Sequence, residues 1–445
     1  MKLPLYVTEC LDALEIAGFA AYAVGGCVRD AVLGRQPQDF DLCTAALPEQ
    51  TQKVFENRKL ILAGLKHGTV GVITEGGVVE ITTFRTEGGY ADSRHPDWVH
   101  FVPEVEDDLA RRDFTVNAMA YSPKRGFRDP FGGRDDLANH ILRAVGDPEQ
   151  RFREDALRIL RGARFASRYG LTPDAATEKA MFSLAPLMDK LARERVFEEL
   201  CKLLMTATAA DLLRFAPVIA AAIPELGAQV GFDQRTPYHA YDIFTHTAHV
   251  VENVPAELTL RWTALLHDVG KPASFTQDEN GQGHFKGHAG VGAEMADGIL
   301  RRLKAPTALR EEVVLLIGQH MNWPAADKKL LRRWMSRLGP EMLDKLLTLQ
   351  AADTAGKGLL KEEEKAQLRQ VRQVVEEIKA ENACLTVRDL GVDGNDLMAL
   401  GFRGKAVGHC LNTLLEQVLD ESLPNERSAL LAAATQMAET NSDAQ

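Results

Sequence analysis

Residues 19–45 read FAAYAVGGCVRDAVLGRQPQDFDLCTA, and this stretch decides the fold of the first part of the chain. Its apolar run ends in Gly25-Gly26, and its last part carries Asp39-Phe40-Asp41. An apolar run followed by two glycines is typical of a buried strand that turns tightly into a helix. We therefore expect a strand, a glycine turn, a helix opened by Val28 and a second strand that carries the two aspartates.

The two aspartates are the first candidates for chemistry. A strand places residues two apart on one face, about 7 Å from each other along the chain. Asp39 and Asp41 would then lie side by side, with Phe40 turned into the core. Two such carboxylates suit a pair of Mg²⁺ ions, which bridge a triphosphate and an attacking hydroxyl, so we predict both aspartates as catalytic metal ligands. Glu80 would supply a third carboxylate, unless it is a plain exposed strand residue.

The glycine turn is the candidate phosphate site. Gly25 and Gly26 let the backbone approach a ligand closely, and the N–H groups exposed at the start of a helix favour an anion. Arg29 would add a charge-assisted contact to the phosphates.

The rest of the chain separates into two kinds of sequence. Residues 67–85, HGTVGVITEGGVVEITTFR, alternate Val, Ile and Thr around a glycine pair, which predicts a hairpin in a small mixed sheet. From about Pro148 onward Leu, Ala and Arg dominate, which favours helices. We therefore predict an α+β head followed by an all-α body.

Composition limits the class of protein. The chain has 445 residues, 45% apolar and 26% charged, which indicates a globular protein with more than one core. It contains no run of about 18 apolar residues, so we expect no membrane span. Acidic residues interrupt the first apolar stretch, which argues against a signal peptide. The six cysteines lie far apart and indicate reduced thiols in a cytoplasmic protein.

The net charge of −11 means that any nucleic acid must bind a local basic surface. The chain has two basic clusters. The first comprises Arg151, Arg153, Arg158, Arg161, Arg164 and Arg168. The second comprises Lys328, Lys329, Arg332, Arg333 and Arg337, and a solvated helical face explains it equally well.

Four motifs together resemble one family. They are GGCVRD at residues 25–30, DFDL at 39–42, RRDFTVNA at 111–118 and EDALR at 154–158. This set resembles the polymerase-β-like nucleotidyltransferases, specifically the bacterial tRNA nucleotidyltransferase and poly(A) polymerase family. The resemblance implies a polymerase-β-like head. The segment GNDLMALGFRGKAVGHCLNTLLEQVL, residues 394–419, is also similar to the tail that holds tRNA in that family.

The EDALR segment suggests how bases are chosen without a template. If residues 154–168 form one helix, its apolar face comprises Ala156, Ile159, Leu160, Ala163 and Ala166. Asp155 and Arg158 are three apart and would be neighbours. A carboxylate beside a guanidinium matches the amino group and ring nitrogen of cytosine and adenine, and leaves guanine and uracil unpaired. The resemblance implies the same roles, with Arg112, Arg161 and Arg164 holding the ribose and triphosphate.

A second set of residues predicts a metal site. His267-Asp268 ends an apolar run, and the order of the other candidates resembles the HD metal-dependent phosphohydrolase domain. The predicted ligands are His246, His267, Asp268, His288, His320 and Asp353. Imidazoles and carboxylates suit one or two divalent transition metal ions, with Lys271 on a substrate phosphate. A 2′,3′-cyclic phosphate or a damaged RNA end is the expected substrate, and a degenerate domain that only shapes the body is the alternative.

These inferences divide the chain into four parts. We expect the nucleotidyltransferase head at residues 1–147, a helical neck with the nucleotide-selecting helix at 148–225, the HD domain at 226–360 and a helical, tRNA-binding body and tail at 361–445.

The predicted reaction is the addition of C, C and A to the 3′ end of tRNA from CTP and ATP. An A-adding enzyme or a poly(A) polymerase shares every head motif. The polar loop at residues 88–98, which includes Asp92–His95, would move between C and A addition and argues against an enzyme that adds only the two cytosines. A nucleotide-signalling protein with hydrolase and synthetase activities would lack RRDFTVNA. A tRNA-binding chaperone with a silent head would not need the intact aspartate pair.

Overall fold

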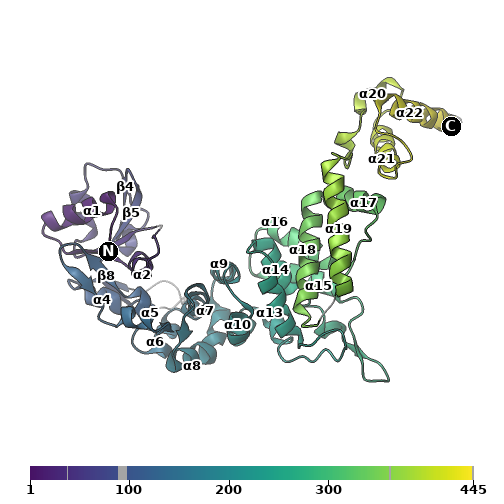
Figure 1. The fold of residues 1–445 in the computed structure, drawn as a ribbon. Coiled ribbons are helices and arrows are strands. Elements are labelled where there is room, and N and C mark those ends of the chain that lie inside the picture. The colour runs from purple at the N-terminus through teal and green to yellow at the C-terminus, as the bar shows by residue number, and fades with distance from the viewer. Residues whose placement is uncertain (38, 89–97, 360–361, 443–445) are drawn as a thin grey trace. The chain divides into compact units, whose positions relative to one another are not determined.

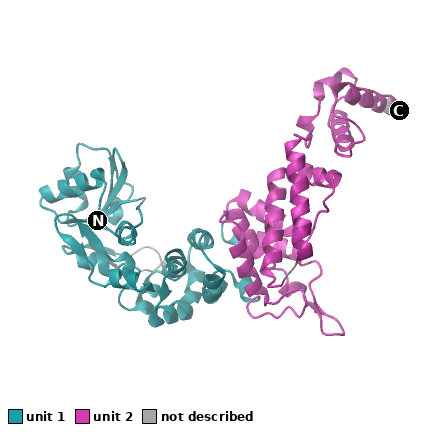
Figure 2. Ribbon diagram, in the orientation of Figure 1, with its two compact units in different colours: residues 1–228, 301–305 teal, residues 229–300, 306–445 magenta. Residues whose placement is uncertain are grey.

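The structure, a computed structural model, describes residues 1–37, 39–88, 98–359 and 362–442 (Figure 1). The chain divides into two compact units (Figure 2). The first comprises residues 1–228 with 301–305, and the second comprises residues 229–300 with 306–445. Within the described residues, no helix has both the length and the apolar character that a membrane crossing needs.

The first unit begins with a mixed sheet of seven strands in the order β3-β4-β5-β2-β1-β8-β9. Strands β2 and β5 are parallel, whereas every other neighbouring pair is antiparallel. The strands are β1 Ala21–Val24, β2 Asp41–Thr44, β3 Leu60–Ile61, β4 Thr69–Thr74, β5 Gly77–Thr83, β8 Ala120–Ser122 and β9 Gly126–Arg128. The α+β head with a small mixed sheet is therefore confirmed, and β4 and β5 form the predicted hairpin.

Short helices complete the head. They are α1 Leu5–Ile16, α2 Gly26–Val32, α3 Pro48–Val54, α4 Val105–Ala110 and α5 Gly133–Ala138. All four residues of β1 are buried, which explains its uninterrupted apolar sequence. Tyr22 and Val24 pack there with Phe84 and Leu109. A separate hairpin joins β6 Arg85–Gly88 to β7 Trp98–Phe101. Residues 89–97 of the expected mobile loop, Asp92–His95 among them, lie outside the described residues.

Helices form most of the rest of the first unit, beside a short parallel pair of strands, β10 Ile141–Leu142 and β11 Thr172–Pro173. The helices are α6 Pro148–Glu154, α7 Leu157–Tyr169, α8 Ala175–Leu184, α9 Arg193–Leu204, α10 Ala209–Arg214, α11 Ala216–Ala222 and α12 Pro224–Gly227. The prediction of one helix over residues 154–168 is wrong. Asp155 has an extended backbone, with φ −142° and ψ 103°, and its side chain accepts the Leu157 N–H at 3.0 Å. A short carboxylate competes in this way with helical hydrogen bonds, so the helix breaks and restarts.

The predicted apolar face of this region is nevertheless confirmed. The buried side chains include Ala156, Ile159, Leu160, Ala163 and Ala166. The break therefore changes the direction of the backbone at Asp155 without exposing the apolar stripe.

The second unit is helical. Its helices are α13 Ile243–Asn253, α14 Leu258–Leu266, α15 His288–Arg302 (whose last two residues belong to the first unit), α16 Thr307–Gln319, α17 Lys328–Leu338, α18 Pro340–Gly356, α19 Glu362–Ala380, α20 Gly394–Ala399, α21 Lys405–Leu419 and α22 Arg427–Ser442. A small hairpin joins β12 Thr276–Gln277 to β13 Gly283–His284. One core lies among α17, α18 and α19, and a second core lies among α20, α21 and α22.

Four of the five cations of the second basic cluster pair with carboxylates within this unit. Arg332 pairs with Glu381 at 3.2 Å and with Glu421 at 2.5 Å. Lys328 pairs with Glu381, and Arg333 pairs with Asp420, each at 2.5 Å. These pairs join α17 to the residues that follow α19 and α21. Lys328, Arg332 and Arg333 therefore help to hold helices of this unit together, while Lys328 and Arg333 stay partly exposed, as the solvated helical face allowed by the sequence requires.

Candidate functional site

The carboxylates of the head converge at the start of β2. Asp41 is the first residue of the strand and Asp39 precedes it, so the prediction that the strand carries both aspartates is wrong for Asp39. Phe40 is turned inward, at 7% exposure, as predicted. The parallel register of β2 and β5 places Glu80 directly opposite Asp41. Burial and the nearby carboxylates of Glu80 and Asp39 raise the pKa of Asp41, an arrangement that a bound cation would relieve.

The glycine turn is held against an arginine. Gly25 has φ 73° and ψ −125°, and its N–H donates to the carbonyl of Met119 at 3.1 Å. A Cβ at this position would lie 2.8 Å from Nη1 of Arg112. The buried Nε of Arg112 has no hydrogen-bond partner within the described residues. The turn therefore needs glycine for its backbone angle and for the space that Arg112 occupies.

Replacing Gly25 with alanine tests this requirement. We expect Gly25→Ala to lower the free energy of unfolding by about 2 kcal/mol, because the backbone is strained without glycine. We also expect nucleotide incorporation to fall on the order of 10²-fold, because Arg112 is displaced. Urea unfolding and an incorporation assay measure the two effects. Gly34→Ala is the matched control, since Gly34 has φ 70° but no neighbour within 4 Å. Equal losses of incorporation in both variants would contradict the role of the Arg112 contact.

Arg29 is placed differently from the expectation. Its side chain is buried, and it donates to the Asn117 side chain at 2.5 Å and to the Tyr169 hydroxyl at 2.5 Å. It also donates to Asp30, and its guanidinium lies 4.2 Å from the centre of the Tyr169 ring. Protein acceptors thus take most of its N–H groups. Arg29 lines the same pocket as Gly25 and Gly26, but these contacts fasten α2 to α7.

The predicted nucleotide-binding side chains meet in one open pocket of the first unit. Its lining includes Gly25, Gly26, Asp39, Asp41, Arg112, Asp155, Arg158, Arg161 and Arg164. Glu80 faces Asp41 across the sheet but is not among the lining residues. The structure therefore brings together the predicted residues of the glycine turn, the aspartate pair and the two arginine-bearing motifs.

Each arginine of this pocket is held by a carboxylate. Arg161 donates twice to Asp113, at 2.9 and 2.7 Å, and Arg164 donates to Glu199 at 2.5 Å. Although burial opposes ionisation, Arg161 and Asn117 lower the pKa of Asp113 to about 2. Charged carboxylates fix the direction of each guanidinium fork, which prepares the site for a polyanion.

The predicted Asp155–Arg158 pair is not a direct contact. Asp155 accepts from Arg195 at 2.9 Å, and Arg158 donates to Glu154 at 2.8 Å. Because the backbone is extended at Asp155, its side chain turns toward α9 instead of along one helix with Arg158. The two groups line one pocket as separate acceptor and donor.

Sequence reasoning missed these supporting partners. Asp113 lies inside RRDFTVNA and Glu154 inside EDALR. The arginines near them in the sequence were the available signal. Arg195 and Glu199 lie 40 and 35 residues from their partners, on a helix whose local pattern indicates only an amphipathic surface.

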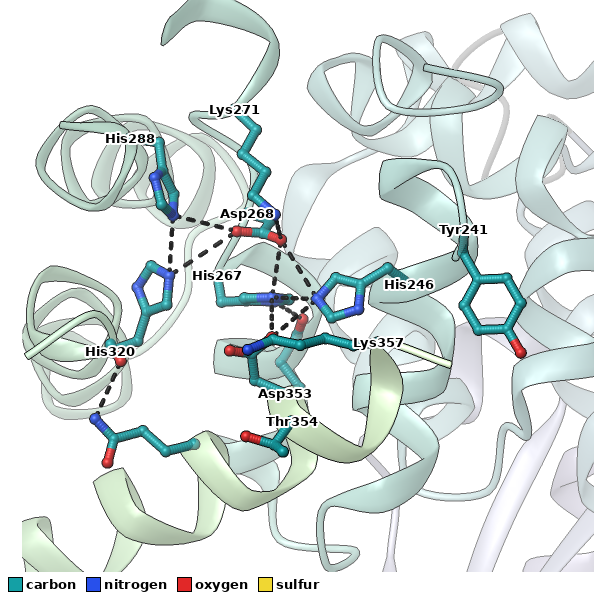
Figure 3. Close-up of polar contacts among 12 residues, drawn as sticks. Tyr241, His246, His267, Asp268, Lys271, His288, His320, Asp353, Thr354 and Lys357 are labelled. Atoms are coloured by element: carbon teal, nitrogen blue, oxygen red, sulfur yellow. Dashed lines mark hydrogen bonds and ion pairs between the residues drawn. The ribbon is translucent and has the colours of Figure 1, made fainter. Parts of the chain in front are cut away.

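The second unit holds the predicted HD residues as two triads that share Asp268 (Figure 3). One triad is His246, His267 and Asp268, and the other is Asp268, His288 and His320. Oδ2 of Asp268 lies 3.1 Å from Nε2 of His267, and Oδ1 lies 3.4 Å from Nε2 of His288. Asp353 joins the first triad, with Oδ1 3.0 Å from Nε2 of His246. All six predicted residues are therefore brought together.

The hydrogen bonds of the imidazoles show that this cluster fits a cation. Nδ1 of His288 contacts the carbonyl of Phe285 at 2.8 Å, and Nδ1 of His320 contacts that of Ile317 at 2.6 Å. A neutral ring held this way carries its proton on Nδ1, so Nε2 presents a lone pair. The two Nε2 atoms face each other at 3.2 Å. Two opposed lone pairs repel unless a positive charge lies near them, so the donor set fits a divalent metal.

Electrostatics favour a neutral ring at His320 and a charged carboxylate at Asp268. Burial, together with His267, lowers the pKa of His320 to about 4. Despite burial, His267 and Lys271 lower the pKa of Asp268 well below its usual range. Burial opposes protonation of His267 as well, but Asp268 and Asp353 raise the pKa of that ring. Asp268 thus keeps its charge and His320 keeps a neutral ring that can bind metal, whereas Asp268 and Asp353 favour a proton on His267 that a metal ion would displace.

A pocket of about 240 Å³ opens onto Asp268, His288, His320 and Asp353. Lys271, the predicted phosphate contact, lines it and lies 2.7 Å from Oδ2 of Asp268 and 2.8 Å from the Gln234 side-chain oxygen. His239 and Lys357 also line the pocket, and no sequence pattern had indicated either residue. The pocket combines fixed positive charge with the metal-fitting cluster, which suits a phosphate ester.

Three segments of the chain match known families. Residues 21–143 match the Poly A polymerase head domain, and residues 238–380 match the HD domain. Residues 170–226 match the family described as the probable RNA and SrmB-binding site of polymerase A.

The chain is similar to CCA-adding enzymes over nearly all of its length. It is 34% identical to the CCA-adding enzyme of Streptococcus thermophilus over 430 residues, which cover 95% of this chain and 94% of that protein. It is 49% identical to the Lactobacillus helveticus CCA-adding enzyme over 205 residues, which cover 45% of this chain and 51% of that protein. The chain thus spans about half the length of some relatives it matches. The structure of the Bacillus stearothermophilus CCA-adding enzyme in complex with CTP has a TM-score of 0.74, 28% identity and full coverage of both chains.

Proposed function

Because this chain belongs to the CCA-adding enzyme family, we propose that it adds C, C and A to the 3′ end of tRNA, using CTP and ATP. The observation that carries this function is the pocket in which Asp39 and Asp41 face a set of fixed arginines. The six free thiols are in keeping with action in a reducing compartment, the cytoplasm.

In this reaction the 3′-hydroxyl of the tRNA attacks the α-phosphate, and pyrophosphate leaves. Asp39 and Asp41 would hold Mg²⁺, with Glu80 opposite Asp41 as a further carboxylate. The ions would supply positive charge to the triphosphate and the attacking hydroxyl. The backbone N–H groups after Gly25 and the guanidinium of Arg112 would contact the phosphates. Arg161 and Arg164, held by Asp113 and Glu199, would bind the remaining negative charge without reorienting.

Asp155 and Arg158 would select the base. The Asp155 carboxylate keeps lone pairs beyond those used by Arg195 and Leu157 and would accept from an exocyclic amino group. Arg158, steadied by Glu154, would donate to a ring nitrogen. Cytosine and adenine satisfy both groups, whereas guanine and uracil would leave buried polar atoms unpaired.

Extension of three RNAs tests the product. We expect a tRNA that lacks CCA to gain three nucleotides, a tRNA that ends in CC to gain one A, and an unrelated RNA to remain unchanged. Separation of the products by length, with each nucleotide supplied alone and together, measures the outcome. Extension of only the CC-ended tRNA would assign A addition, and long tails on the unrelated RNA would assign a poly(A) polymerase.

The shared Asp268 cluster supports a second activity. We propose that the second unit binds a divalent transition metal and hydrolyses a phosphoester such as a 2′,3′-cyclic phosphate at an RNA end. His246, His267, Asp268 and Asp353 would hold one ion, and Asp268, His288 and His320 a second. The ions would polarise the phosphate and activate water. Lys271, buried against Phe285 and Gln234, would neutralise a phosphate oxygen.

A further inference from the structure

The β12–β13 hairpin carries a histidine–aspartate pair to the mouth of the HD pocket. Nε2 of His284 lies 3.0 Å from Oδ2 of Asp278, and His284 lines the pocket beside Phe285 and His288. We propose that His284 is the general acid of this site and protonates the leaving oxygen of the phosphoester, with Asp278 as its positioning partner. This inference rests on the proposed phosphohydrolase function.

The Asp278 carboxylate is fixed before any ligand binds. Its Oδ1 accepts the backbone N–H of Asn280 at 3.0 Å and that of Gln282 at 2.9 Å, which leaves Oδ2 for His284. The hydrogen bond from His284, followed by those two backbone N–H groups, lowers the pKa of Asp278. A carboxylate with three donors in place holds its partner ring in one orientation.

The hairpin is itself anchored to the pocket wall. Thr276 pairs with His284 in the strand register, and the flanking rings of Phe275 and Phe285 lie 5.5 Å apart. A Cβ on Gly283 would lie 2.2 Å from the carbonyl oxygen of Gln234, the residue whose side chain also holds Lys271. His284 is therefore attached to the same wall that positions the phosphate-binding lysine.

His284 differs from the metal-fitting histidines in its tautomer. His267, His288 and His320 contact a backbone carbonyl through Nδ1 and present Nε2 to the cluster. His284 contacts a carboxylate through Nε2, so Nδ1 is the nitrogen left for a ligand. Its side chain is 48% exposed, which allows proton exchange with water. A carboxylate partner and access to solvent are the features of an acid–base histidine, whereas a carbonyl partner is the feature of a ligand.

A water oxygen forms a new bond to phosphorus, and the bond from phosphorus to the leaving ribose oxygen breaks. The electron pair of the broken bond stays on the ribose oxygen, which takes the proton from Nδ1 of His284. The proton lost by the water passes to solvent, and the imidazole regains one from solvent.

Two substrates with different leaving groups test the assignment. With the full chain saturated with Co²⁺, we expect His284→Gln to slow hydrolysis of adenosine 2′,3′-cyclic phosphate by about 10²–10⁴-fold, because its ribose leaving group needs a proton. Hydrolysis of bis(4-nitrophenyl) phosphate should change less than about threefold, because nitrophenolate leaves without a proton. Asp278→Asn should slow hydrolysis of the cyclic phosphate by a smaller factor and should also leave hydrolysis of the nitrophenyl ester nearly unchanged. Equal losses on both substrates would overturn the assignment.

Metal content separates an acid from a ligand. We expect His284→Gln to bind the same number of Co²⁺ ions as the unaltered chain, measured by equilibrium dialysis, and a loss of bound Co²⁺ would overturn the assignment. His249→Gln is the matched control, since His249 also lies beside a carboxylate in this unit, 3.9 Å from Glu252, but does not line the pocket. The His249→Gln variant should hydrolyse both substrates at the rate of the unaltered chain. Failure of the unaltered chain to hydrolyse either substrate would instead overturn the phosphohydrolase function itself.

Discussion

Replacing Asp39 and Asp41 together by asparagine is expected to abolish nucleotide incorporation, with a fall of about 10⁴-fold or more. Removal of both charges would remove the ligands for Mg²⁺, and a metal supplies several kcal/mol of transition-state stabilisation. The fold should survive. Because burial, followed by repulsion from Glu80 and Asp39, raises the pKa of Asp41, loss of the two aspartate charges should leave the free energy of unfolding unchanged or slightly higher. Incorporation of labelled CTP and ATP into tRNA, with urea unfolding, measures both quantities.

Asp107→Asn is the control for this double substitution. Asp107 is an exposed acid of α4 in the same unit and does not line the nucleotide pocket. It should retain incorporation within about twofold, as expected of a surface change. Retained incorporation in the double variant would refute the metal assignment and would favour a head that only binds RNA.

The second large effect is expected at Asp268. Because this carboxylate belongs to both triads, Asp268→Asn should reduce metal binding at both, and phosphoester hydrolysis should fall at least about 10³-fold, as several kcal/mol of metal-dependent stabilisation are lost. The metal-free fold should also weaken, by about 3 kcal/mol, because Lys271 and His267 lose a buried partner. Bound metal is therefore measured by dialysis well below the Tm of the variant.

Glu294→Gln provides the comparison for Asp268→Asn. Glu294 is exposed on α15, the helix that begins with His288. The Glu294→Gln variant should bind metal and hydrolyse the phosphoester as the unaltered chain does. If Asp268→Asn still binds two ions with unchanged affinity, the shared carboxylate is not a ligand and the cluster serves the fold alone.

The head and its site could be predicted because their signals are local. An apolar strand, two glycines and an acidic pair lie within 25 residues, and each follows from backbone preference or side-chain periodicity. The position of Glu80 opposite Asp41 was harder to predict, since it depends on the register of two parallel strands. Sequence alone identifies Glu80 as a strand residue. It does not show which strand lies beside it or which residue it faces.

Long-range partners explain the contacts that local patterns did not predict. Arg29 suits a phosphate by its place after the glycines, but Tyr169, 140 residues away, supplies a buried hydroxyl and ring. The break at Asp155 had a local signal, because aspartate often caps a helix, but the apolar stripe continues through it and favours one helix. The carboxylates that neutralise the second basic cluster are equally invisible to local patterns.

The ion pairs that α17 forms with Glu381, Asp420 and Glu421 make the attachment of the C-terminal helices depend on ionic strength. The side chains in these pairs are partly exposed, so each pair is worth at most about 1 kcal/mol and is screened as ionic strength rises. Leu385 is the apolar residue shared by the core of α17–α19 and the core of α20–α22. Salt also weakens contacts between proteins and RNA phosphates. The attachment of the C-terminal helices and the electrostatic part of RNA affinity should therefore decline together as salt is added.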